Sequence, residues 1–142
     1  MPLTGIHLLL SYQCTYECDH CFVWSSPRAD GTMRLETLLE ILDQAAELGT
    51  IEEIYFEGGE PFLFYPMLVE GLRHAHARGF RTGVVTNCYW ATDVPDAMLW
   101  LGPLKDLAVA DLSVSSDTFH AGEVKDPRPD NAVIAAEILG LD

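Results

Sequence analysis

The sequence predicts one α/β domain, residues 1–142, in which four parallel strands alternate with four helices. Two observations carry this prediction. Short apolar runs of strand length recur four times, and the segments between them place apolar residues at helical spacing. Such alternation requires right-handed crossovers, so the C-terminal ends of all four strands lie along one rim. With 142 residues, 49% of them hydrophobic, the chain can fill a core of its own.

The first two strand–helix units lie in the N-terminal half. Residues 6–12 form an apolar run typical of a strand buried on both faces. A helix follows, with Thr32 as its N-cap and Gly49 as its stop. Residues 54–56 predict the second strand, and Pro66 suits the first turn of the helix after it.

The third and fourth units follow the same order. Residues 83–86 predict a strand, and residues 96–101 predict a short helix between two prolines. Residues 107–114 contain the fourth strand, and residues 131–139 predict the last helix, with Asp130 as its cap. The chain therefore reads as strand then helix, four times.

Three cysteines, Cys14, Cys18 and Cys21, follow the first strand. Three thiolates on one short loop can hold three irons of a [4Fe-4S] cluster and leave the fourth iron open to a ligand. The alternative is a structural zinc ion with His20 as its fourth ligand. A disulfide is disfavoured, because four cysteines in a cytosolic chain are more typical of metal ligands or reactive thiols.

The other three strands also end in polar or glycine-rich motifs, which we expect to meet the cysteines at one mouth. These motifs are Gly58-Gly59-Glu60 after the second strand, Thr86-Asn87 after the third, and Ser113, Ser115 and Asp117 at the fourth. Simpler interpretations are a strand-ending turn at the glycines, a turn asparagine at Asn87 and a capped strand end at the serines. The connection over residues 116–130 is long enough to act as a lid, and its His120 could contact a substrate or lie in solvent.

Together, the four motifs resemble those of the radical S-adenosylmethionine (SAM) enzymes. The cysteine spacing is similar to the family's cluster motif, in which an aromatic residue commonly precedes the last cysteine, and His20 occupies that place. Residues 57–61 look like the family's Gly-Gly-Glu element. The resemblance implies a parallel-stranded partial (βα) barrel with about four of the usual six units present. Residues 1–142 would then be a core domain truncated at its C-terminal end.

The resemblance also implies a chemistry. A [4Fe-4S] cluster bound by the three cysteines would bind SAM and cleave it reductively to a 5′-deoxyadenosyl radical, which abstracts hydrogen from a substrate that the sequence does not identify. Glu60 is the choice for the SAM amino group, with Glu57 a weaker candidate, and hydroxyls and a carboxylate can pair with ribose. A low-potential donor such as flavodoxin or ferredoxin would supply the electron. The expected cofactor contacts are Gly58, Gly59, Glu60, Thr86, Asn87, Ser113, Ser115, Asp117 and His20.

The composition limits the classes of partner that the chain is expected to bind. A formal charge of −14, from 22 acidic and 8 basic residues, argues against a nucleic-acid partner. We expect a cytoplasmic protein, since no apolar run approaches the roughly 20 residues of a membrane span and no signal peptide is recognisable. The fourth strand would have an open edge, which predicts a fragment or a second chain that completes the barrel. The rival functions are a noncatalytic iron–sulfur binding module and a zinc-stabilised interaction domain.

Overall fold

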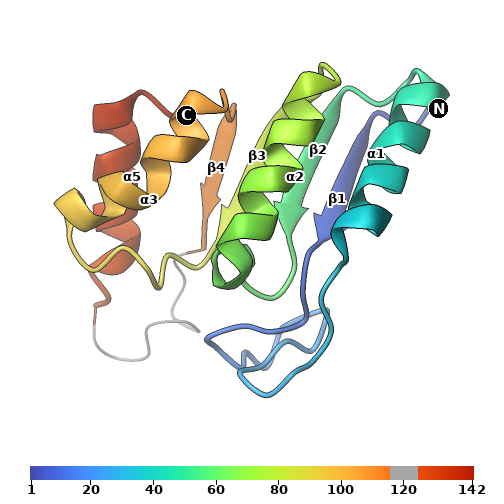
Figure 1. Ribbon diagram of the computed structural model, residues 1–142. Coiled ribbons are helices and arrows are strands. Elements are labelled where there is room, and N and C mark those ends of the chain that lie inside the picture. Colours follow the sequence, from blue (N-terminus) through green and yellow to red (C-terminus); the bar gives the residue numbers. More distant parts are fainter. Residues whose placement is uncertain (116–124) are drawn as a thin grey trace.

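In the computed structural model, which describes residues 1–115 and 125–142, the chain forms a four-stranded parallel sheet covered by helices (Figure 1). The spatial order of the strands equals their order in the chain, so every crossover moves in the same direction. The α/β fold with parallel strands, predicted from the sequence, is confirmed. The strands are β1 (Gly5–Leu9), β2 (Glu53–Glu57), β3 (Arg81–Thr86) and β4 (Asp111–Val114). The helices are α1 (Leu35–Leu48), the short 3-10 helix η1 (Pro61–Phe64), α2 (Tyr65–Ala77), α3 (Val94–Asp106) and α5 (Arg128–Leu139).

The two faces of the sheet differ in burial. On β2, Ile54 and Phe56 are fully buried among the helices, whereas Tyr55 between them is half-buried on the opposite face. On that opposite face the ring of Tyr55 stacks on His7 of β1, with 4.9 Å between the ring centroids. A Cβ on Gly83 of β3 would lie 2.4 Å from the same Tyr55 ring. One face of the sheet therefore forms the core, and the other face is open and partly polar.

The start of the chain differs from the sequence prediction at two boundaries. The first strand was expected to reach residue 12 but ends at Leu9, because the backbone of Tyr12 turns away from the sheet and donates to the carbonyl of Gly31. Thr32 was expected to cap α1, yet it forms a bridge with Ser11 and the helix begins at Leu35. Pairing within the loop between β1 and α1 therefore displaces both boundaries.

The third helix, α3, is longer than predicted. The carboxylate of Asp93 accepts a hydrogen bond from the N–H of Asp96 at 2.7 Å and caps it, so Pro95 falls in the first turn, where no N–H partner is needed. Pro103 lies inside the helix and removes one backbone bond, which leaves the helix intact to Asp106. The last helix, α5, likewise begins before the predicted position, at Arg128.

Because the four strands are parallel, the loops that follow them lie at one end of the sheet. The arrowheads of all four strands point toward the end where the loop between β1 and α1 lies, and the N-terminus is at the other end (Figure 1). The N–H of Leu112 on β4 donates to the carbonyl of Asp142 at 2.7 Å, so the last residue lies beside β4. Within the described residues, the helices are too short or too polar to traverse a bilayer.

Candidate functional site

Four segments that follow the four strands line one pocket at this rim. They are the cysteine loop (residues 10–34), the Gly-Gly-Glu turn (residues 57–60), the turn at Thr86 and Asn87, and Ser115. The structure thus brings together motifs that lie about 100 residues apart in the chain. The lining includes Cys14, Cys18, His20, Cys21, Ser25, Glu57, Gly58, Gly59, Glu60, Thr86, Asn87 and Ser115.

The structure places only one of the three predicted contacts Ser113, Ser115 and Asp117 in the lining of the pocket. The hydroxyl of Ser113 is directed along its strand and donates to the carboxylate of Asp111 at 3.0 Å, and Ser113 is not among the residues that line the pocket. Ser115 lines the pocket, and its N–H donates to the carbonyl of Thr86 at 2.9 Å. Asp117, like His120 and most of the proposed lid, lies outside the described residues.

The three loop cysteines are half-buried. Burial raises the pKa of Cys14, although the N–H of Tyr16, 3.5 Å from its sulfur, opposes that shift. Burial also opposes ionisation of Cys21, but hydrogen bonds led by that from the N–H of Ser25, at 3.3 Å, outweigh it and lower the pKa of Cys21. Backbone N–H groups directed at sulfur favour the thiolate, which is the form that binds metal. Cys88, in contrast, is fully buried, and burial raises its pKa to about 12.

The arrangement of the three cysteines can be compared with what a [4Fe-4S] cluster and a single metal ion each require of their ligands. Within residues 1–115 and 125–142, no three Cys, His, Asp or Glu side chains converge at the spacing of one metal ion. A cube-shaped cluster gives each cysteine its own iron, so its three ligands need not meet at one point. Three thiols around one pocket therefore fit a cluster better than a single ion, and the Gly-Gly-Glu turn and Ser115 line the same pocket.

The two glycines of the Gly-Gly-Glu turn are required because neighbouring parts of the chain leave no room for a side chain at either position. Gly58 has φ +86, and a Cβ there would lie 2.6 Å from the Cα of Leu9. Gly59 has φ +52, and a Cβ there would lie 2.0 Å from the carbonyl oxygen of Gln13. The next N–H, that of Glu60, donates to the same carbonyl at 2.8 Å. The absence of a side chain at these glycines thus lets the turn lie directly against the backbone of the cysteine loop.

The carboxylate of Glu60 is directed inward and is only 1% exposed. It accepts hydrogen bonds from the hydroxyl of Thr86 at 2.7 Å, the N–H of Asn87 at 2.7 Å and the N–H of Phe62 at 3.2 Å. Burial nevertheless dominates and raises the pKa of Glu60 to about 7. Oε1 accepts two of the three bonds and Oε2 accepts one, so Oε2 keeps the larger unused acceptor capacity.

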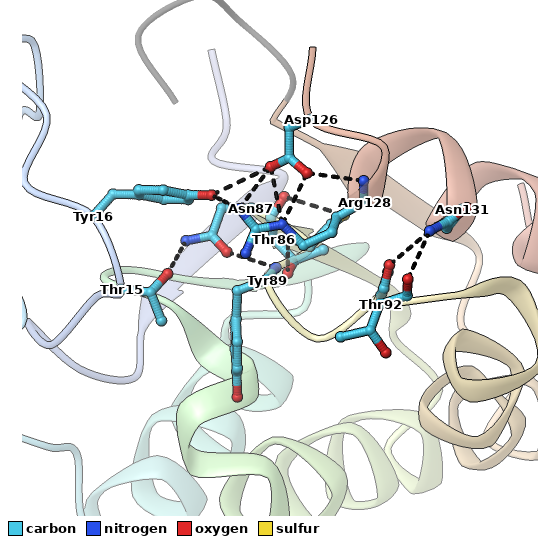
Figure 2. A network of polar contacts seen from close by, with 11 residues as sticks. Thr15, Tyr16, Thr86, Asn87, Tyr89, Thr92, Asp126, Arg128 and Asn131 are labelled. Atoms are coloured by element: carbon cyan, nitrogen blue, oxygen red, sulfur yellow. Dashed lines mark hydrogen bonds and ion pairs between the residues drawn. The ribbon is translucent and has the colours of Figure 1, made fainter. Parts of the chain in front are cut away.

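Sequence reasoning missed a polar network that joins the cysteine loop to the start of α5 (Figure 2). Arg128 donates from Nη2 to the hydroxyl of Tyr16 at 2.6 Å and to the carboxylate of Asp126 at 2.7 Å. The hydrogen bond from the Arg128 guanidinium holds the pKa of Asp126 below its usual range. No sequence pattern signals this contact, because Tyr16 and Arg128 are 112 positions apart.

Ser25 is a second lining residue that the sequence did not indicate. It is buried in the wall of the pocket beside Cys21, and its backbone N–H and its hydroxyl both contribute to lowering the pKa of the Cys21 thiol.

Comparison with known sequences identifies the family. The sequence profile described as the Radical SAM superfamily matches residues 8–132. A putative peptide biosynthesis protein, YydG, of Bacillus subtilis (strain 168) is 30% identical over 120 residues, which cover 84% of this chain and 38% of YydG. The PqqA peptide cyclase of Granulibacter bethesdensis is 33% identical over 90 residues, covering 61% of this chain and 23% of the cyclase. The chain thus spans less than two fifths of the length of these relatives.

A solved structure shows the same fold. The crystal structure of Streptococcus suis SuiB bound to S-adenosylmethionine superposes with a TM-score of 0.56 and 13% sequence identity. The match covers 97% of this chain and 39% of SuiB.

Proposed function

The chain belongs to the radical SAM superfamily, and from this we propose that it binds a [4Fe-4S] cluster and SAM as the N-terminal part of a radical SAM core domain. Cys14, Cys18 and Cys21 would hold the cluster. One observation carries the proposal: the three thiols line one pocket with the turns that follow the other three strands.

The SAM site would occupy the part of the pocket beyond the cysteines. The backbone of Gly58 and Gly59, with Oε2 of Glu60, would bind the amino group, and Glu57 adds a second carboxylate to the same lining. Ser115 would contact the ribose or carboxylate. The remaining expected contacts are Thr86, Asn87 and His20 in the lining, Ser113 next to it, and Asp117 beyond the described residues.

When bound, the cluster supplies the electron for reductive cleavage of SAM, and a flavodoxin or ferredoxin would deliver that electron. The residues of this chain bind and orient: the buried Glu60 joins the Gly-Gly-Glu turn to the Thr86–Asn87 turn, and the N–H of Glu60 joins both to the cysteine loop. The names of two relatives refer to peptides, so a peptide is the substrate class that we propose to test first.

Iron and acid-labile sulfide analysis after anaerobic reconstitution tests the proposal. About four irons and four sulfides per chain are expected, as a [4Fe-4S] cluster requires. Replacing Cys14, Cys18 or Cys21 by alanine should abolish this content. Cys88→Ala is the matched control, because Cys88 is fully buried outside the loop and should retain the cluster. One equivalent of zinc without sulfide would contradict the cluster and favour the zinc-stabilised domain. A cluster that does not respond to SAM would favour a noncatalytic iron–sulfur module.

A further inference from the structure

Asn87 lies between the cysteine loop and the buried carboxylate of Glu60. Its side-chain amide donates from Nδ2 to the sulfur of Cys14 at 3.4 Å and to the hydroxyl of Thr15 at 3.1 Å. Figure 2 shows this amide directed at the cysteine loop. Only 6% of Asn87 is exposed, so water does not compete freely for the amide.

Three contacts fix the orientation of this amide. Its Oδ1 accepts a hydrogen bond from the N–H of Tyr89 at 3.1 Å, which requires that the amino end face the other way, toward Cys14. The N–H of Asn87 itself donates to Oε2 of Glu60 at 2.7 Å, and the hydroxyl of Thr86 holds the other oxygen of the same carboxylate. The donor is thus held in place from both its side chain and its backbone.

We propose that Asn87 is a positioning residue that donates a hydrogen bond to the Cys14 thiolate of the bound cluster and thereby raises the reduction potential of that cluster. The inference rests on the proposed function. Reduction adds negative charge that the cluster shares with its sulfur ligands, and a donor directed at a ligand sulfur stabilises the reduced form more than the oxidised form. Glu60 serves as the anchor that keeps the Asn87 backbone, and with it the donor, in reach of Cys14.

The competing role for Asn87 is that of a turn residue alone. Its Oδ1 bond to the N–H of Tyr89 is the kind of contact that asparagine makes in turns. Asp can make the same contact, because its carboxylate also accepts from that N–H. An Asn87→Asp variant therefore preserves the turn while it replaces the donor toward sulfur by an anion, which separates the two roles.

A redox titration of the reconstituted chain, followed by electron paramagnetic resonance without SAM, tests the inference. Poised at the wild-type midpoint, Asn87→Ala should show an about fivefold lower ratio of reduced to oxidised cluster, the equivalent of losing one hydrogen bond. The ratio of reduced to oxidised cluster should be lower still in Asn87→Asp, because this variant adds negative charge beside the thiolate. Thr15→Val is the matched control, since it removes the other acceptor of the same amide and should leave the ratio within about twofold of wild type.

Two results would overturn the inference. Asn87→Ala and Asn87→Asp clusters that titrate like wild type would show that the amide does not act on the cluster. Loss of the cluster from both variants, with the Thr15→Val cluster intact, would make Asn87 a structural residue only. Failure of the wild-type chain itself to assemble a cluster would instead contradict the proposed function, and the inference would fall with it.

Discussion

The buried carboxylate of Glu60 makes a sharp prediction about how stability depends on pH. Three donors hydrogen-bond to it and favour its charged form, but burial outweighs them and raises its pKa in the folded chain to about 7, against 4.5 for a free side chain. A Glu60→Gln variant has nearly the same shape and cannot ionise. The difference between wild type and variant therefore isolates the ionisation of this one group.

The raised pKa of Glu60 sets both the sign and the size of the change in unfolding free energy with pH. Because the folded-state pKa is raised, the folded chain holds this proton over a pH range in which the unfolded chain has lost it. The stability linked to Glu60 is therefore fully present below pH 4.5 and is lost as the pH rises to about 7. A rise of the pKa from 4.5 to about 7, at about 1.36 kcal/mol for each pKa unit, corresponds to about 3 kcal/mol.

Urea unfolding of the metal-free, reduced chain between pH 4 and pH 8 measures this difference. The free energy of unfolding of wild type, relative to Glu60→Gln, should decrease by about 3 kcal/mol across the range. Glu47→Gln, at an exposed position on α1, is the matched control for loss of an acidic residue. A relative free energy that does not change with pH would show that the three hydrogen bonds balance burial, and one that increases would show that they outweigh it; either result contradicts a raised pKa for Glu60.

Two further predictions concern the contacts that position the cysteine loop. Gly59→Ala should destabilise the chain by about 2 kcal/mol or more in thermal unfolding, since it places a Cβ 2.0 Å from the carbonyl of Gln13 at a φ of +52; an unchanged melting temperature would contradict the turn geometry. Tyr16→Phe removes the hydroxyl that Arg128 binds and should cost about 1 kcal/mol, seen as faster amide hydrogen exchange within residues 14–24. Tyr12→Phe, which removes an exposed tyrosine hydroxyl from the same loop, is the control, and equal exchange in wild type and Tyr16→Phe would show that the network does not hold the loop.

The fold was predictable because its signals are local. The apolar run around Ile54 and Phe56 and the helical spacing that places Leu72 in the core each lie within one element, and the structure buries all three side chains completely. The boundaries were less predictable, because they depend on distant pairing. Thr32 has the chemistry of an N-cap but is held in a bridge to Ser11, 21 positions earlier, so the helix begins later.

The position of the site was predictable and its internal contacts were not. Parallel topology alone brings the motifs after four strands to one rim, whichever residues they contain. The inward orientation of Glu60 depends on donors 26 and 27 positions later, at Thr86 and Asn87, and no local pattern encodes such a contact. The contact of Tyr16 with Arg128 was missed for the same reason.

The most direct test of the account is the electron paramagnetic resonance spectrum of the anaerobically reconstituted, dithionite-reduced chain, recorded with and without SAM. We expect a reduced-cluster signal that changes when SAM is added, because the three cysteines line the same pocket as the Gly-Gly-Glu turn and Ser115, and a cluster held by three cysteines would keep one iron open to a ligand. A signal that is identical with and without SAM would contradict the proposed SAM site, and the absence of a cluster signal would contradict the assignment of the three cysteines.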